Sequence, residues 1–335
     1  MTDDFIAGAL STERVGDALY PCRLPLSRRH FFPSDELIRR ARMTSGVRVR
    51  VETDATALRL RFAPLPELEG DKTPRGHSFD AVIENQIVQS CFCDGGAEEA
   101  IFRLERGGRR IVEIWLPPGA PVGLRDLAAE DGSFLCPAPD RRPLWVTWGS
   151  SLTHCIRAGS AARIWPGTVA RRRNLNLVCL GFGGQCHLDP LVAMTIRDLP
   201  ARYLSMKLGI NAVGGSLNAR TYPALVAAAI QIVRERHPQT PLAMISPICS
   251  PPRETTPGVS GYSLQAMRED MERVCRAFQA AGDRRLFYIN GLELFGPDDI
   301  ARYAAEDLLH PNAEGIDLQA DRFDRIVMPR LLADS

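Results

Sequence analysis

Residues 144–153 have the sequence LWVTWGSSLT, and this stretch decides the fold of the chain. Its first five residues are apolar or β-branched, which is typical of a buried strand, and Gly-Ser-Ser then ends that strand. In α/β sheets, ligands bind at the carboxyl ends of the strands. The stretch therefore predicts a strand that presents the hydroxyl of Ser151 at a ligand-binding edge. Small residues after a strand also form ordinary turns, so a role for Ser151 depends on other groups.

The chain after this strand alternates between short apolar runs and segments of helical composition. Five strands that alternate with helices predict a parallel sheet with helices on both faces, joined by right-handed crossovers. The candidate strands are residues 144–148, 177–182, 203–210, 242–248 and 286–289. The candidate helices are residues 161–173, 188–199, 222–236, 264–281 and 313–332.

The residues before this stretch have a different period. Residues 47–52 and 57–62 alternate apolar with charged side chains, so one face of each strand would meet a core and the other face water. Residues 79–84 and 87–92 flank a two-residue Asn-Gln connection and predict a β-hairpin. Seven or eight short strands without a convincing helix predict an antiparallel β-sandwich of jelly-roll kind.

Length and composition fit a globular chain of two domains. The chain has 335 residues, of which 45% are hydrophobic and 24% are charged. A proline-rich stretch separates the two patterns, and proline neither continues a helix nor fits a central strand. We therefore expect a β-sandwich domain in residues 1–137, a linker in residues 138–143 and an α/β domain in residues 144–335.

Several classes of partner are not expected. The net charge of +1 argues against nucleic acid, and no apolar run approaches the roughly 20 residues of a membrane span. The acidic N-terminus lacks the features of a secretory signal, and an odd count of nine cysteines favours reduced thiols, so we expect a cytoplasmic location. Cys91, Cys93 and the pair Cys186-His187 have no partner pair at zinc-site spacing, so no metal or other cofactor is expected.

Two further strand ends carry candidate oxyanion donors. The second strand runs into GFGGQ at residues 181–185, where glycines leave backbone N–H groups uncovered, and Gly184 is the expected donor. A phosphate-binding loop is the alternative, but neither the dinucleotide fingerprint nor a Walker lysine is present. The third strand ends at Asn211, whose side-chain amide can either cap the next segment or act as a second donor.

An acid and a base stand near the C-terminus. The spacing of Asp307 and His310 would place both on one side of a helical turn, where the carboxylate could fix the tautomer of the imidazole. The other ring nitrogen would then face Ser151 as a general base. A surface His-Pro turn is the alternative interpretation. Among the other histidines, His154 has no acid at suitable spacing, whereas His187 follows the glycine loop and is expected to contact substrate.

These motifs resemble the four sequence blocks of the SGNH hydrolase superfamily, the GDSL-type esterases. The resemblance spans roughly residues 144–330 and implies a flavodoxin-like three-layer α/β/α fold with a five-stranded parallel sheet. The preceding sandwich is similar to that of two-domain members, some of which act on acylated carbohydrates and some of which transfer acyl groups in natural-product biosynthesis. The matching residues are 149–153, Gly184, 209–211 and 307–310, and the departures are Ser150 and Ala212, where the family commonly has Asp.

The resemblance also implies a role for each polar group. Ser151 would be the nucleophile, His310 the base and Asp307 the third member of a triad. The backbone N–H of Ser151, the N–H of Gly184 and the side chain of Asn211 would form the oxyanion hole.

We therefore expect two-step acyl transfer from a small-molecule ester, thioester or acylated sugar through an acyl-enzyme. Hydrolysis is the first hypothesis, and transfer of the acyl group to a natural-product hydroxyl is the alternative. The insertion at residues 249–262 would form a lid or one wall of the acyl pocket, and Trp148 and Arg253 are expected to contact substrate beside His187. A carbohydrate-binding protein with an inactive catalytic domain is a further alternative, which the intact triad disfavours. A nucleotide-binding flavodoxin-like domain is disfavoured because residues that would hold phosphate are missing.

Overall fold

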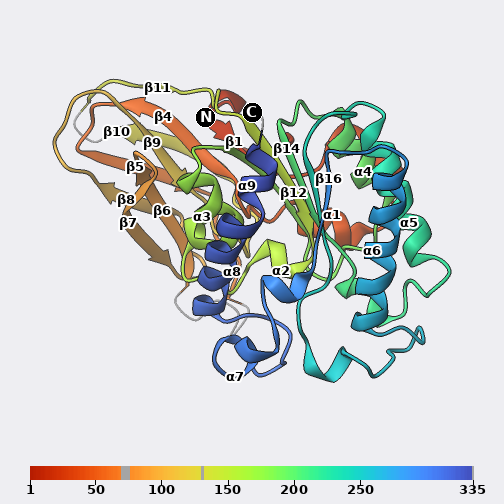
Figure 1. The fold of residues 1–335 in the computed structure, drawn as a ribbon. Coiled ribbons are helices and arrows are strands. Elements are labelled where there is room, and N and C mark those ends of the chain that lie inside the picture. The colour runs from red at the N-terminus through yellow and green to blue at the C-terminus, as the bar shows by residue number, and fades with distance from the viewer. Residues whose placement is uncertain (69–75, 130–131, 334–335) are drawn as a thin grey trace. The chain divides into compact units, whose positions relative to one another are not determined.

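The computed structural model describes residues 1–68, 76–129 and 132–333, and Figure 1 shows the order of its elements. The first eleven strands are β1 (Ile6–Ala7), β2 (Ser11–Val15), β3 (Ala18–Cys22), β4 (Arg48–Thr53), β5 (Ala57–Phe62), β6 (His77–Ile83), β7 (Gln86–Cys93), β8 (Glu99–Arg103), β9 (Arg110–Trp115), β10 (Leu124–Ala129) and β11 (Leu135–Pro137). The remaining strands are β12 (Leu144–Gly149), β13 (Asn176–Gly181), β14 (Tyr203–Lys207), β15 (Leu242–Ile245) and β16 (Leu286–Ile289). The helices are α1 (Asp35–Ala41), α2 (Ser151–His154), α3 (Trp165–Arg172), α4 (Pro190–Asp198), α5 (Tyr222–Arg234), α6 (Leu264–Ala280), α7 (Ile300–Tyr303), α8 (Ala313–Ile326) and α9 (Met328–Leu332).

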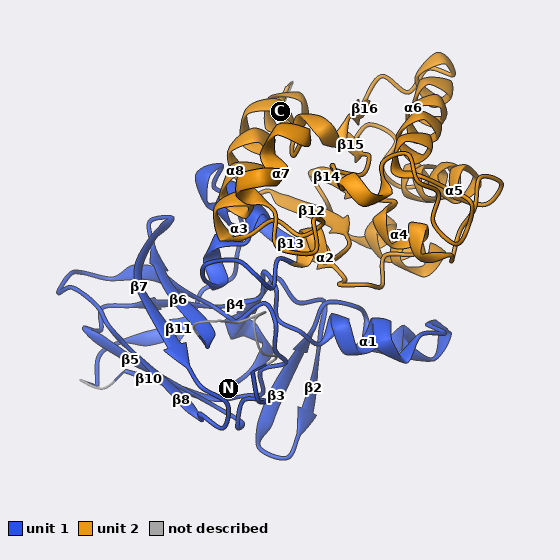
Figure 2. Ribbon diagram, turned by 90° about the horizontal axis from the view of Figure 1, so that it is seen from below, with its two compact units in different colours: residues 1–142, 155–179 blue, residues 143–154, 180–335 orange. Residues whose placement is uncertain are grey.

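The chain forms two compact units, which Figure 2 distinguishes by colour. Unit 1 comprises residues 1–142 and 155–179, and unit 2 comprises residues 143–154 and 180–335. A short segment after α2 therefore belongs with the N-terminal strands, although the sequence pattern assigned it to the α/β part. The proposed domain limits, with a linker at residues 138–143, stay a prediction.

Unit 1 contains two antiparallel sheets. One has the order β1-β4-β9-β6-β7 with β11 paired to β4, and the other has the order β2-β3-β10-β5-β8. The apolar faces of the alternating strands form one core, in which the rings of Phe62 and Phe79 stack with their centroids 4.9 Å apart. Because Phe62 lies on β5 and Phe79 on β6, this contact joins the two sheets. The predicted antiparallel sandwich is confirmed.

The predicted hairpin is present between β6 and β7, with a different turn. Glu84 and Asn85 both have positive φ, 48° and 65°, which is the conformation of a type I′ turn. The expectation of a sandwich without helices is wrong at α1. Ser34 caps this helix by accepting a hydrogen bond from the N–H of Leu37 at 3.1 Å.

Buried polar contacts attach residues 155–179 to the sandwich of unit 1. The carboxylate of Asp80, on β6, is fully buried and accepts hydrogen bonds from Ser160 Oγ at 2.6 Å and from the N–H of Ala162 at 2.7 Å. Arg23 is fully buried as well and donates to the carbonyl of Cys179 at 2.9 Å. Breaking such buried bonds leaves unsatisfied polar groups, so the segment is held to the sandwich.

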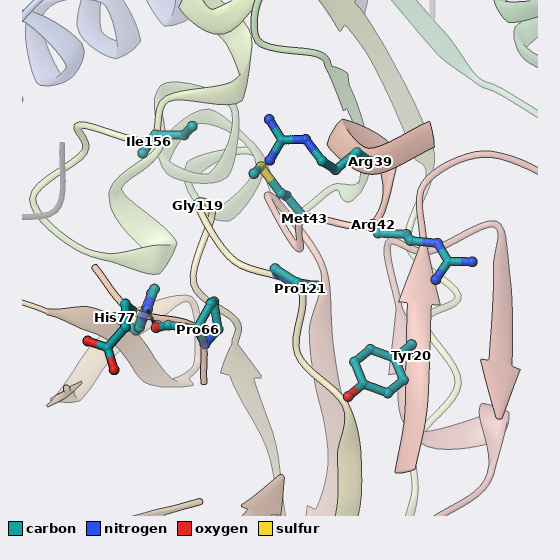
Figure 3. A pocket seen from close by; sticks show the side chains of 10 residues that line it. Tyr20, Arg39, Arg42, Met43, Pro66, His77, Gly119, Pro121 and Ile156 are labelled. Carbon is teal, nitrogen blue, oxygen red and sulfur yellow. Dashed lines mark hydrogen bonds between the residues drawn. The ribbon is translucent and has the colours of Figure 1, made fainter. Parts of the chain in front are cut away.

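Unit 1 also contains a pocket of about 340 Å³, shown in Figure 3. His77 lies beside Pro66 there, and its Nε2 donates to the Pro66 carbonyl at 2.8 Å. The lining residues are Tyr20, Arg39, Arg42, Met43, Pro66, Glu67, His77, Gly119, Pro121 and Ile156. None of the residues proposed above for catalysis lines this pocket.

The α/β part has a five-stranded sheet with the order β13-β12-β14-β15-β16. β12, β14, β15 and β16 pair in parallel. Numbered along the chain, this order is 2-1-3-4-5, which is that of flavodoxin-like folds. Figure 1 shows α4, α5 and α6 on one side of this sheet and α8 and α9 on the other. The predicted three-layer parallel fold is confirmed, and its topological switch point lies between β12 and β14.

Two of the predicted helices are divided in the structure. Residues 161–173 form a short 3-10 helix and then α3, and residues 313–332 form α8 and then α9. Pro166 and Pro329 occupy the first turns of the second pieces, because proline has no N–H to donate to a preceding turn. Within the described ranges, no helix is both long and apolar enough to cross a bilayer.

Candidate active site

The nucleophile candidate lies at the junction of β12 and α2. Gly149 ends the strand where the side chain of Thr153 approaches so closely that a Cβ on Gly149 would lie 2.2 Å from Thr153 Oγ1. Ser150 immediately precedes the helix, and its Oγ accepts a hydrogen bond from the N–H of Leu152 at 3.2 Å. The Ser150 hydroxyl thus serves as a helix cap, and Ser151 is the first residue of α2.

Three polar side chains from distant parts of unit 2 form one hydrogen-bonded chain. Ser151 Oγ lies 2.7 Å from His310 Nε2, and His310 Nδ1 lies 2.6 Å from Asp307 Oδ2. The carboxylate can only accept, so Nδ1 carries the proton and Nε2 is left to accept from the Ser151 hydroxyl. This is the arrangement that makes a serine nucleophilic in acyl-transfer enzymes.

The turn that carries the acid and the base differs from the predicted helical turn. Asp307 Oδ1 accepts from the N–H groups of Leu309 at 3.0 Å and His310 at 2.9 Å, and Leu308 has a φ of +51°. The expectation of a helix was wrong here because the Asp side chain takes the N–H groups that a helix would use, and Pro311 disfavours helical geometry before it. The spacing of three nevertheless brings the two side chains together.

The electrostatics of the turn keep Asp307 ionised. Partial burial by itself would raise the pKa of the carboxyl group, but hydrogen bonds from the N–H and the imidazole of His310 and from the N–H of Leu309 lower this pKa to about 2. The carboxylate of Asp307 is therefore charged above that pH and can accept the hydrogen bond from His310 Nδ1.

The three N–H groups expected to form an oxyanion hole belong to Ser151, Gly184 and Asn211. Asn211, in the 3-10 helix after β14, accepts the N–H of Cys186 with its Oδ1 at 3.0 Å, which fixes the orientation of its amide group. Gly184 has a φ of +70°, a conformation that favours glycine. In the part of the chain that the structure describes, no hydrogen-bond partner is assigned to Asn211 Nδ2 or to the N–H of Ser151 or Gly184.

The three residues expected to contact substrate, Trp148, His187 and Arg253, have different surroundings. Trp148 has 0% exposure, and a side chain without exposed surface has nothing to offer a ligand, so Trp148 is a core residue. His187 uses both ring nitrogens within the protein, in contacts with Ser216 Oγ and with the carbonyl oxygen of Gly184. Arg253 donates to Ser250 Oγ at 2.9 Å. Substrate contact by His187 and by Arg253 stays a prediction.

Ser250 is a residue that the sequence did not single out. It is fully buried at the start of the insertion after β15, and its Oγ donates to the carbonyl of Leu308 at 2.9 Å. Gly258, farther along the insertion, lies where a Cβ would be 2.5 Å from the carbonyl of Val213, next to the segment that carries Asn211. The insertion thus borders both the triad turn and the Asn211 segment.

The sequence matches the GDSL-like lipase/acylhydrolase family over residues 142–328 and the N-terminal domain of SsfX3 over residues 5–122. The first match covers more than half of the chain. The chain belongs to the GDSL-like lipase/acylhydrolase family. It is therefore an enzyme of the esterase or acyltransferase class. A comparison with curated proteins finds no match.

Solved structures share both parts of the fold. The salicylyl-acyltransferase SsfX3 from a tetracycline biosynthetic pathway is 26% identical, with a TM-score of 0.89 over 98% of this chain and 95% of that one. A putative GDSL-like lipase from Bacteroides ovatus is 14% identical, with a TM-score of 0.79 over 97% and 95% of the two chains. A family two carbohydrate esterase from Clostridium thermocellum is 15% identical, with a TM-score of 0.67 over 97% and 99%. The latter two show the fold alone.

Proposed function

We propose that this enzyme transfers an acyl group from a small-molecule ester, thioester or acylated sugar through an acyl-enzyme on Ser151. The observation that carries the proposal is the continuous hydrogen-bonded chain from Ser151 through His310 to Asp307. The three N–H donors described above supply the second requirement, which is stabilisation of the charge that develops on the carbonyl oxygen.

In the first step, Ser151 Oγ attacks the carbonyl carbon while its proton passes to His310 Nε2. Ser151 N–H, Gly184 N–H and Asn211 Nδ2 hold the oxyanion of the tetrahedral intermediate. The bond to the leaving group then breaks, and the departing alcohol or thiol takes the proton from His310. In the second step, the acceptor gives its proton to His310 as it attacks the acyl carbonyl carbon. The bond between this carbon and Ser151 Oγ then breaks, and Oγ takes the proton back from His310.

Labelling with a fluorophosphonate probe tests this proposal without knowledge of the substrate. The probe should react with Ser151 alone among the serines, as peptide mapping by mass spectrometry would show, and Ser151→Ala should remove both the label and the turnover of an activated aryl ester. A Ser151→Ala variant with wild-type turnover would refute the proposal. Absence of labelling in the folded wild-type protein would instead support a carbohydrate-binding protein with an inactive catalytic domain.

Two acceptors are compatible with this site. Hydrolysis, with water as the acceptor, is the first candidate because the acyl-enzyme needs no further group to react with water. Transfer to the hydroxyl of a small molecule is the second candidate, and the similarity to the acyltransferase SsfX3 over nearly the whole of both chains supports it. Only exclusion of water from the acyl-enzyme separates the two reactions.

The measurement that separates these candidates is product analysis. The enzyme would be given an acyl thioester together with a series of aromatic and polyol alcohols in water, and the free acid and the acylated alcohols would be quantified. A hydrolase yields free acid at a rate that the alcohols do not change. A transferase yields the acylated alcohol with little free acid.

A further inference from the structure

A buried histidine that is not part of the triad lies three residues after the nucleophile. His154 ends α2, has 0% exposure and accepts a hydrogen bond at Nδ1 from the N–H of Gly183 at 3.2 Å. A backbone N–H can only donate, so Nδ1 carries no proton in this arrangement and the neutral ring has its hydrogen on Nε2. His154 is therefore not poised to act as the base for Ser151, which already bonds to His310.

The end of β13 and the glycine loop that follows it pack closely against α2. A Cβ on Gly181 would lie 2.4 Å from the backbone nitrogen of His154, and a Cβ on Gly183 would lie 3.4 Å from His154 Nδ1 and 3.7 Å from Ser151 Cβ. The Cα of Gly183 thus faces both the imidazole of His154 and the side chain of Ser151. The next residue is Gly184, the proposed oxyanion donor.

A second histidine holds the other side of this loop. His187 Nε2 lies 3.0 Å from the carbonyl oxygen of Gly184, which can only accept, so Nε2 donates. In the neutral ring, Nδ1 then accepts from Ser216 Oγ at 2.7 Å. Ser216 follows the 3-10 helix that carries Asn211, so His187 connects the two segments that bear the second and third oxyanion donors.

We propose that His154 and His187 are positioning residues that hold the Gly183-Gly184 loop so that the Gly184 N–H faces the oxyanion. This inference rests on the proposed function. It adds two residues that neither contact the substrate nor take part in the proton transfer between Ser151 and His310. Adjacent glycines have unusually large backbone freedom and no side chains that could fix the loop by packing. A displacement of a catalytic group by about 1 Å can slow a reaction by about 100-fold. The hydrogen bonds of His154 with Gly183 and of His187 with Gly184 would limit such a displacement of the Gly184 N–H.

A pair of substitutions at His154 isolates the hydrogen bond to Gly183. His154→Leu fills the cavity but offers no acceptor, whereas His154→Asn places a carbonyl oxygen near the position of Nδ1. We expect His154→Leu to lower kcat with an activated aryl ester by about 10- to 100-fold with KM changed less than about threefold, and His154→Asn to recover most of this loss. A merely structural role would lower thermal stability in both variants and would not separate kcat from KM.

Affinity for a boronate that forms a tetrahedral adduct with Ser151 supplies a second readout. It should fall in parallel with kcat in His154→Leu, since the adduct needs the oxyanion donors, while the KM for the aryl ester stays near the wild-type value. A folded His154→Leu variant with wild-type kcat and boronate affinity would overturn the proposal. Equal losses in the Leu and Asn variants would also overturn it.

For His187, separate measurement of kcat and KM distinguishes a positioning role from substrate contact. His187→Ala should lower kcat about 10-fold and leave KM near the wild-type value, and Ser216→Ala should have a smaller effect in the same direction. A rise in KM at constant kcat would show instead that His187 binds substrate, and its part of the proposal would fail.

The bond can also be observed in the unmodified protein, in case His154→Leu does not fold. Nitrogen NMR of protein with labelled histidine should show His154 as a neutral ring with hydrogen on Nε2 and an unprotonated Nδ1. A proton on Nδ1 would overturn the proposal. This measurement needs no turnover, so its outcome is separate from that of Ser151→Ala, which tests the acyl-enzyme itself.

Discussion

Replacement of Asp307 by Asn should inactivate the enzyme while leaving the triad turn folded. The amide oxygen of Asn can replace Oδ1 as acceptor for the N–H groups of Leu309 and His310, which lie 3.0 and 2.9 Å away. The amide NH2 would then stand where Oδ2 now accepts from His310 Nδ1 at 2.6 Å. An NH2 group only donates, so Nδ1 must become the acceptor and the proton must move to Nε2.

With its proton on Nε2, His310 can no longer accept the proton of Ser151. We expect a fall in kcat/KM of about 1,000- to 10,000-fold, the range that a wrong imidazole tautomer produces in serine enzymes. This corresponds to about 4 to 5.5 kcal/mol of lost transition-state stabilisation at about 1.36 kcal/mol for each factor of ten. The exposure of the Asp307 side chain, 40%, argues for a small effect on the free energy of unfolding.

The assay is turnover of an activated aryl ester together with the rate of fluorophosphonate labelling of Ser151. Glu306→Gln is the matched control, because it makes the same chemical change one residue away, at an exposed side chain. The control should retain wild-type rates. If Asp307→Asn stays within about tenfold of the wild-type rate, the carboxylate does not set the tautomer of His310, and the reasoning from the 2.6 Å contact is refuted.

Three further changes are expected. Asn211→Ala should lower kcat by about 100- to 1,000-fold with little change in KM, and a change confined to KM would remove Asn211 from the oxyanion hole. Ser250→Ala removes the buried donor to the Leu308 carbonyl. The free energy of unfolding, measured in urea, should therefore fall by about 1 to 3 kcal/mol, and turnover should slow. An unchanged denaturation midpoint would contradict this prediction. The pKa of Asp307 is lowered to about 2, so this carboxyl group is largely deprotonated above that pH. Asp307 should therefore add no ionisation to the acid limb of kcat/KM above about pH 4, which should follow a single proton. A two-proton slope in that range would refute the role of Asp307 as a charged carboxylate.

Period and local spacing made much of this protein readable from its sequence. Apolar runs that alternate with helical segments predicted the parallel sheet, and the period-two pattern of the first domain predicted the antiparallel sandwich, because both patterns reflect which side chains meet a core. The helix α1 was missed although Ser34 and the acidic residues after it are a capping signal, since seven residues carry too little periodicity beside strong strand patterns.

The candidate site residues could be predicted from the sequence because each follows a strand or belongs to a short motif. Ser151, Gly184 and Asn211 each follow a predicted strand, and Asp307 and His310 are three residues apart. Trp148 was misplaced because an aromatic residue beside a nucleophile looks the same in sequence whether it faces the pocket or the core.

The sequence by itself therefore determined the two kinds of sheet, the family and the candidate side chains, since these depend on composition and on spacing along the chain. Only the tertiary structure decided the strand order and the turn in which Leu308 takes a positive φ. It also decided the hydrogen bond from Ser250 to that turn and the hydrogen bonds of His154 and His187 to the glycine loop. The physical reason is that a hydrogen bond depends on distance and direction in space. Ser151 and His310 meet at 2.7 Å across a separation of 159 residues, and no local pattern encodes that distance.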